Sequence, residues 1–217
     1  MVNKKLTLQA DPKSRDSERS QLAILRAAAD EFALHGLGGA RVDSIAQRSG
    51  LNKRLIYYYF HNKDQLFTAV LEAAYADIRS AEQQLHLNDL APPEAISALI
   101  AFTWDYYLAN PSFLTLLNSE NLHKGKHIAQ SKAAAATNSP LIKTLAQLLE
   151  RGRDDGVFRG GVDPLQLYVS IAGLAYFYLS NNFTLSAIFS RNLMSRKALT
   201  ERQSHIQELI LGYLLIG

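Results

Sequence analysis

The stretch RVDSIAQRSGLNKRLIYYYFHNKDQLF, from Arg41 to Phe67, predicts two short helices joined by a tight turn. Gly50 lies where a close turn between helices needs a residue without a Cβ atom, and Asn52 is a favourable N-cap for the next helix. Apolar residues on both helices would form a small shared core, namely Ile45, Ala46, Leu51 and Ile56. This pattern is typical of a helix-turn-helix motif, whose second helix enters a DNA major groove.

The helical period decides what the second helix faces. With Ile56 in the core, Phe60 turns back to the core four residues later, and the side chains on the other face point outward: Lys53, Arg54, Tyr57 and Tyr58. Cations suit phosphates, and planar donors and phenol hydroxyls suit base edges. The alternative is that the charges are merely solvated and the tyrosines are core. The turn, the cap and the charge distribution together favour DNA.

Charge is uneven along the 217 residues, which carry a net charge of +3 and a pI near 9.0. Residues 1–63 hold eleven Lys or Arg and six Asp or Glu, whereas the remainder holds twelve basic and fourteen acidic residues. A basic first third predicts an anionic polymer as the partner of that part only. Charge alone would also fit a membrane surface.

Composition excludes several classes of protein. The absence of cysteine excludes a disulfide framework, a cysteine zinc site and a thiol nucleophile. The first twenty residues are polar and do not resemble a signal peptide. The longest apolar run, Ile171 to Leu179, is far shorter than the roughly 20 residues that span a bilayer. We therefore expect a soluble, cytoplasmic protein.

Periodicity predicts an all-α chain with about nine helices, no run of alternating strands and no internal repeat. We expect the TNSP sequence to end a weakly specified helix near residue 136 and Pro140 to begin another. The segment NNFTLSAIFSRN, residues 181–192, is ambiguous. The better specified helices are expected at about residues 17–35, 41–49, 53–60, 63–85, 93–110, 111–123, 140–155, 164–181 and 200–215.

The stretch from residue 41 to 67, with ILRAAADEFALHGLGGA before it, resembles the TetR family of bacterial transcriptional regulators. The resemblance covers about residues 18–80, and the positions in register are Phe32, Gly36, Ile45, Ala46, Gly50, residues 57–60 and Lys63. It implies a homodimer with two DNA-binding heads. It also implies an inducer pocket in the helices after about residue 80 and dimerisation through the last two long helices.

The resemblance also implies DNA contacts. They fall on Arg41 and Ser44 in the second helix, on Lys53, Arg54, Leu55, Tyr57, Tyr58 and Tyr59 in the third, and on Lys63 as a phosphate contact. The chain departs from the family at Arg54 and Leu55, where small residues are common, so base preference does not transfer. Leu55 suits contact with a thymine methyl group. Tyr59 suits either phosphate or core.

Three segments follow from these observations: a flexible basic arm at 1–17, a DNA-binding head at 18–78 with its helix-turn-helix at 41–60, and a ligand-binding and dimerisation domain at 79–217. This N-terminal region, with Lys4, Lys5, Lys13, Arg15 and Arg19, either contacts the DNA backbone or minor groove or is a solvated tail. Nearby Asp11, Asp16 and Glu18 weaken the case for contact.

Candidate ligand contacts are polar and aromatic residues on otherwise apolar helices, although such residues are more often plain core. They are Trp104, Tyr107, Asn118, Asn121, His123, Tyr168, Tyr176 and Asn181. The set suggests a small, flat or polar molecule, aromatic or heterocyclic. The apolar helix at 164–181 and the amphipathic helix at 200–215 suit a homodimer interface, although both could be the core of a monomer.

Other chemistry is weakly supported. Glu120, His123 and His127 have metal-ligand spacing, but Gly125 interrupts the helix and a fourth ligand is lacking, so we expect no metal and no cofactor. No phosphate-binding glycine loop or nucleophile elbow occurs, and we expect no enzyme. We expect a repressor that a small-molecule inducer releases from a palindromic operator. The alternatives are a constitutive regulator without inducer and a small-molecule-binding α-helical protein that does not bind DNA.

Overall fold

A computed structural model describes residues 12–216, although not the side chains of residues 12–15 and 132–139. The chain divides into two compact units, residues 1–70 and 71–217. Over the described residues it has eleven α-helices and one short 3-10 helix, and no strand beyond an isolated bridge between Phe158 and Leu215. The all-α prediction is confirmed, and the count of about nine helices is too low. No helix of the described part is long and apolar enough to cross a membrane.

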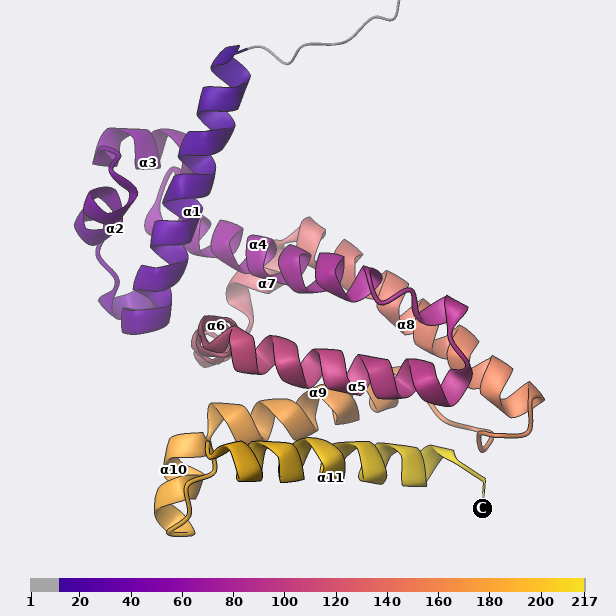
Figure 1. Ribbon diagram of the computed structural model, residues 1–217. Helices are drawn as coiled ribbons and strands as arrows, with labels where there is room; N and C mark the ends of the chain where they lie inside the picture. The colour runs from indigo at the N-terminus through magenta and orange to yellow at the C-terminus, as the bar shows by residue number, and fades with distance from the viewer. Residues whose placement is uncertain (1–11, 217) are drawn as a thin grey trace, which may run out of the picture. The chain divides into compact units, whose positions relative to one another are not determined.

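The first unit contains α1 (Pro12–Gly39), α2 (Val42–Ser49), α3 (Lys53–Phe60) and the start of α4 (Lys63–Gln83), with α2 and α3 beside α1 in Figure 1. The helix α1 begins before the expected Ser17 and includes part of the segment expected to be an arm. Gly36 has non-helical angles (φ 64°, ψ 174°) and interrupts α1 directly after the expected stop at His35. Residues 1–11, with Lys4 and Lys5, lie outside the described residues, as do the side chains of Lys13 and Arg15.

The core of this unit is small and partly aromatic. Phe32 of α1 and Phe67 of α4 are both fully buried and meet edge to face with ring centroids 5.0 Å apart. Such aromatic pairs contribute about 0.5–1.5 kcal/mol beyond the burial of their area. The other buried side chains of this unit come from α1, α2, α3 and α4 and include Ile24, Ala28, Ile45, Ile56 and Leu66.

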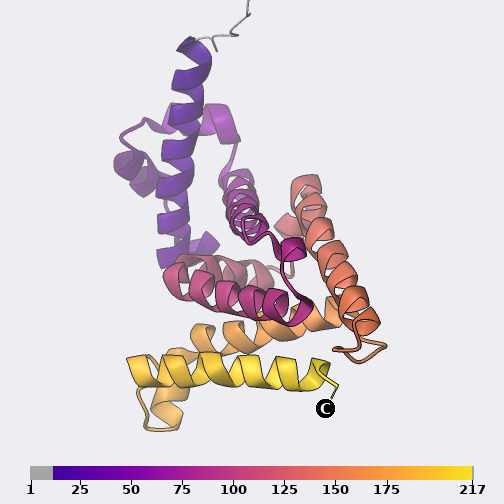
Figure 2. The same ribbon diagram turned by 45° about the vertical axis from the view of Figure 1, so that its right-hand side comes forward.

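The second unit contains the rest of α4 and eight further helices, which Figures 1 and 2 show from two sides. Prolines at or next to their first position begin α5, α6 and α9, and the Asp163 side chain caps α9 by accepting from the Gln166 amide at 2.7 Å. The elements are η1 (Leu87–Asp89), α5 (Pro92–Ala109), α6 (Pro111–Leu122), α7 (Lys126–Gln130), α8 (Lys132–Asp154), α9 (Pro164–Ser180), α10 (Asn182–Ile188) and α11 (Arg196–Leu214).

Three segments differ from the expectation, and two of them, α7 and α10, raise the count. The helix α8 is continuous through Pro140, where the sequence predicted one helix ending and another beginning. A proline inside a helix removes one backbone hydrogen bond, and α8 continues despite that loss. The ambiguous segment after Asn181 forms α10, and the segment after the KGK sequence forms α7.

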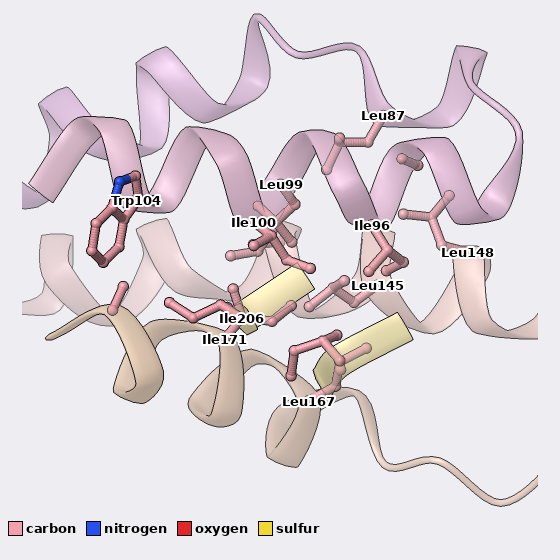
Figure 3. Close-up of a cluster of buried hydrophobic side chains, with 14 of the residues drawn as sticks. Leu87, Ile96, Leu99, Ile100, Trp104, Leu145, Leu148, Leu167, Ile171 and Ile206 are labelled. Atoms are coloured by element: carbon pink, nitrogen blue, oxygen red, sulfur yellow. The ribbon is translucent and has the colours of Figure 1, made fainter. Parts of the chain in front are cut away.

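The core of the second unit lies among α5, α8, α9 and α11. Figure 3 shows apolar side chains of α5 and α9 pointing toward one another, with α8 and α11 completing the cluster. Fully buried members include Ile96, Leu99, Ile100, Leu145, Leu167, Ile171 and Ile206. Since α5 and α9 are apolar around most of their circumference, they can be covered by neighbours on several sides.

The loop between α8 and α9 is fastened to the end of the chain. The amide of Arg159 donates to the Leu214 carbonyl at 2.8 Å, and the amide of Ile216 donates to the Val157 carbonyl at 3.1 Å. This pairing places the fully buried Phe158 against Gly152 of α8. A Cβ atom at Gly152 would lie 2.1 Å from the Phe158 ring, so only glycine fits there.

We predict that Gly152→Ala destabilises the protein by about 1–3 kcal/mol, because the buried ring must shift. Urea denaturation followed by circular dichroism measures the change. The matched control is Gly38→Ala at the end of α1, where an added Cβ would meet nothing within 4 Å. A Gly152 variant as stable as the Gly38 variant would contradict this packing.

Candidate functional site

The turn between α2 and α3 is held by backbone geometry and one side-chain cap. Gly50 adopts the left-handed conformation (φ 71°, ψ 14°), and the next amide, of Leu51, donates to the Ala46 carbonyl at 3.2 Å. The Asn52 side chain then accepts from the Leu55 amide at 2.9 Å. These bonds satisfy backbone groups that the two helix ends would otherwise leave without partners.

The helix α3 presents two different faces. Ile56 and Phe60 are buried at 2% and 9% exposure, whereas Tyr58 is 72% exposed and Tyr57 45%. Lys53 and Arg54 are exposed as well, and Leu55 and Tyr59 are half-buried. The Tyr59 ring lies between Tyr58 and Phe60, with centroids 5.1 and 6.3 Å away, so it supports the exposed face from beside the core.

The two cations at the start of α3 differ in their surroundings. The Lys53 ammonium lies 2.5 Å from an Asp43 carboxylate oxygen. Arg54 makes no ion pair or hydrogen bond with the described residues, so its guanidinium is available for a hydrogen-bond acceptor outside the chain. Exposed ion pairs contribute only about 0–1 kcal/mol, so a phosphate can compete for Lys53. The positive end of the α3 dipole adds to both charges.

Lys63 takes part in the folded head. Its ammonium donates to the carbonyls of Gly38 and Ala40, at 3.4 and 3.2 Å, where the end of α1 leaves carbonyls without helical partners. The resemblance implied a phosphate contact for this lysine. The geometry gives it a structural role at the end of α1 and leaves one N–H of the ammonium available.

Glu31 links α1 to α2. It is buried at 2% exposure, accepts from the Arg41 amide at 3.0 Å, and lies 3.7 Å from the Arg48 guanidinium. The Arg41 side chain itself is exposed at the N-cap of α2, and Ser44 is half-buried in the first turn. The buried carboxylate therefore fixes the start of the helix that carries these two predicted contacts.

The aromatic ligand candidates on α5 are both buried in the second unit. Trp104 lies 5.8 Å from the Tyr178 ring between centroids, and Tyr107 stacks on Phe113 at 5.8 Å. Trp104 is 2% exposed, which places it among the core side chains of Figure 3.

The candidates on α6 and α9 are only partly brought together. The Asn118 amide accepts from the Tyr176 hydroxyl and donates to Ser180 Oγ at 3.0 Å. Asn121 and Asn181 instead bond carbonyls of their own helices. His123 is exposed, with its ring edge-on to His127 at 5.7 Å.

Tyr168 leads to a buried polar cluster that the sequence analysis missed. Arg79 of α4 donates from Nη2 to the Tyr168 hydroxyl at 2.8 Å and from Nη1 to a Glu82 carboxylate oxygen at 2.5 Å. Arg79 and Glu82 are 5% and 6% exposed. The sequence contained a signal for this cluster, because Arg79 and Glu82 are a charged pair three residues apart on the apolar stripe of α4 that includes Ile78.

Burial shapes the ionisation of this cluster. It raises the pKa of Glu82, an effect that Arg79 partly opposes. Burial also raises the pKa of Tyr75 and of Tyr107, and Tyr168 adds to both shifts while Arg79 opposes them. The phenols therefore stay neutral and able to donate hydrogen bonds near the guanidinium.

A cavity of about 290 Å³ adjoins this cluster. It is lined by the end of α4, by η1 and by α8, with Arg79, Glu82, His86, Leu87, Leu141 and Thr144 among its residues. A wider groove of about 610 Å³ lies along α9 and α11 and is lined by Val169, Leu209 and Tyr213 among others.

Glu120 and His127 interact directly. The Glu120 carboxylate accepts from the backbone amides of His127 and Ile128 at 2.7 and 3.0 Å and lies 2.6 Å from His127 Nδ1. It thus caps the start of α7. Within the described residues no group of three or more potential ligands is placed to hold a metal ion.

Comparisons with known proteins agree with this geometry. A family model described as bacterial regulatory proteins, tetR family, matches residues 24–70, and one described as the tetracyclin repressor-like C-terminal domain matches residues 92–210. The chain is 36% identical over 205 residues to the HTH-type transcriptional repressor NicS of Pseudomonas putida, covering 94% of this chain and 97% of that protein.

Two further matches are more distant. The HTH-type transcriptional repressor SCO4008 of Streptomyces coelicolor is 34% identical over 165 residues, which are 75% of this chain and 81% of that protein. A solved TetR family transcription regulator from Marinobacter aquaeolei aligns with a TM-score of 0.70 at 16% identity, covering 94% of this chain and all of that one, and supports the fold.

We predict that Glu31→Leu destabilises the protein by about 1–3 kcal/mol, because it removes the acceptor of the partly buried Arg41 amide. Urea denaturation provides the measurement. Asp30→Asn is the control, because Asp30 is exposed and its ion pair with Arg48 spans 3.9 Å. Equal stabilities for the two variants would mean that Glu31 does not link α1 to α2.

Proposed function

The chain belongs to the TetR family of bacterial regulatory proteins, and on that premise we propose that it is a homodimeric repressor that a small molecule releases from its operator. The outward face of α3 is the observation that supports the proposed DNA binding. With Ile56 buried, Tyr57 and Tyr58 are exposed on the same helix, and Arg54 is exposed without an ion pair or hydrogen bond to the described residues. The names of NicS and SCO4008, both transcriptional repressors, support repression.

In the proposed complex, α3 enters the major groove. Arg54 and the tyrosine hydroxyls read base edges, because planar donors and hydroxyls fit the groove's hydrogen-bonding pattern. Lys53 leaves Asp43 for a phosphate, and Leu55 contacts a thymine methyl. Positioning contacts to the backbone come from Arg41, Ser44, Tyr59 and the remaining N–H of Lys63.

A second copy of the chain is the proposed occupant of the groove along α9 and α11. Large apolar side chains of α9 and α11 are exposed in and beside this groove, namely Leu165, Val169, Phe177, Leu209 and Tyr213. Exposed apolar patches of this kind mark interaction surfaces. Dimerisation is typical of the family, and a two-fold dimer would present two α3 helices to half-sites about 34–36 Å apart.

The proposed domain organisation is the one predicted from the sequence. It has an arm at 1–17, a DNA-binding head at 18–78 and a ligand-binding and dimerisation domain at 79–217. The ligand site lies in the last of these. Binding of ligand and of operator would oppose each other with equal coupling energy, since linkage is reciprocal. The helix α4 is continuous from Lys63 to Gln83 and carries residues of both compact units, so it suits transmission between them.

We predict that Arg54→Ala weakens operator binding by about 1–3 kcal/mol and relaxes base preference at one position of each half-site. Fluorescence anisotropy with the operator and with single-base variants of it measures both effects. Arg196→Ala, which removes an exposed arginine at the start of α11, is the control and should bind as the parent does. If Arg54→Ala changed neither affinity nor preference, the proposed orientation of α3 would be wrong.

A further inference from the structure

An ion pair joins the two helices of the helix-turn-helix. The Lys53 ammonium, at the first position of α3, lies 2.5 Å from a carboxylate oxygen of Asp43 in the first turn of α2. Both side chains remain accessible, Lys53 at 46% exposure and Asp43 at 76%. The pair therefore lies at the surface, where a partner outside the chain can reach either charge.

Asp43 places a negative charge beside the face of α3 that is proposed to contact DNA. Lys53 and Tyr57 lie one helical turn apart on that face, and both are exposed. The exposed Asp30 of α1, in contrast, pairs with Arg48 of α2 at 3.9 Å. A duplex that receives the Lys53 ammonium must therefore approach the Asp43 carboxylate as well.

We propose that Asp43 competes with DNA for Lys53 and thereby lowers the affinity of the protein for duplex of any sequence. The inference rests on the proposed function and concerns the strength of its DNA binding. Each head must break the ion pair before Lys53 can bind a phosphate. The carboxylate left behind then lies close to the duplex, which carries about one negative charge per 1.7 Å of its axis. Both effects oppose binding.

The opposite role, in which Asp43 positions Lys53 for a phosphate, is weaker on physical grounds. A lysine ammonium is a compact charge on a flexible stem, so it gains little from being oriented, unlike the planar fork of an arginine. The contact of 2.5 Å also lets the carboxylate offset the positive charge that would attract the phosphate. Competition therefore outweighs orientation.

The competition should change how DNA binding depends on salt. A lysine that binds a phosphate releases a cation condensed on the duplex, which contributes about 0.9 to the slope of log K against log salt. When Lys53 leaves Asp43, the free carboxylate attracts a cation from solution, so little net release results. Removal of the Asp43 charge should therefore steepen the slope by up to about 0.9 for each head.

The effect of Asp43 should not depend on base sequence. It acts on a lysine that is proposed to bind phosphate, and phosphate contacts carry no direct information about the bases. Asp43→Asn should therefore tighten binding to all duplexes by the same factor. Arg54→Ala, in contrast, is expected to change base preference. The two substitutions separate affinity from recognition within one helix-turn-helix.

The test measures fluorescence anisotropy of the full-length protein between about 50 and 200 mM salt. The probes are a duplex that the protein has selected from random sequence and a scrambled duplex of the same composition. At about 50 mM salt we expect Asp43→Asn to bind both about threefold more tightly for each head, hence about tenfold for a dimer. Thermal melting should show no gain in stability, because a negative charge in the first turn of α2 favours the helix.

Matched variants test whether Asp43 acts through Lys53. Asp43→Glu keeps the charge and should bind as the parent does. Asp30→Asn makes the same change in net charge on α1 and should leave the affinity and the salt slope nearly unchanged. In a protein that already carries Lys53→Gln, Asp43→Asn should gain much less affinity, because no ammonium remains to be released.

Unchanged or weaker DNA binding by Asp43→Asn would overturn the proposal. An equal gain from Asp30→Asn, or an equal gain in the presence of Lys53→Gln, would also overturn it, because the effect would then be one of general charge. A parent protein that binds its selected duplex while Asp43→Asn binds no more tightly keeps the proposed function and loses this inference. A parent that binds no duplex at all overturns both.

Discussion

The burial of Ile56 is the constraint on which the proposed DNA-binding face depends. The helix α3 has only eight residues, and its side chains follow the regular helical period. Placing Ile56 and Phe60 inward therefore leaves one outward face, which carries Arg54, Tyr57 and Tyr58. Gly50 and Asn52 fix where that helix starts, and Glu31 fixes α2 against α1. The face is therefore set by a small core and a few backbone bonds, and the exposed residues are free to vary with the operator.

The basic residues of the head have distinct roles. Arg54 has no partner among the described side chains, Lys53 is held by an ion pair that a phosphate can displace, and Lys63 is occupied at the end of α1. A count of basic residues in the sequence does not distinguish these three side chains. Recognition by Arg54 is our proposal, whereas Lys63 contacts the carbonyls at the end of α1, so a loss of DNA binding on replacing Lys63 would need a folding control.

Local signals made much of the fold predictable from the sequence. Caps and turns act over a few residues, so Asn52 and Gly50 identified helix ends correctly. The prediction that one helix ends before Pro140 and another begins there was wrong, because a proline lowers the probability of a helix without forbidding one. The partner of Arg79, Tyr168, lies 89 residues away, and only the packed fold brings them together, so the cluster was not predictable as a site. The predicted ligand residues Asn121 and Asn181 bond within their own helices, which an aromatic or polar side-chain pattern does not reveal.

Hydroxyl-radical footprinting tests the central claim most directly. It is performed with the purified protein on a duplex that the protein has selected from random sequence. Two α3 helices related by a two-fold axis should protect two patches on one face of the duplex, with centres about 34–36 Å apart. A single protected patch, or uniform protection along the duplex, would contradict the account of a dimer that reads DNA through the face set by Ile56.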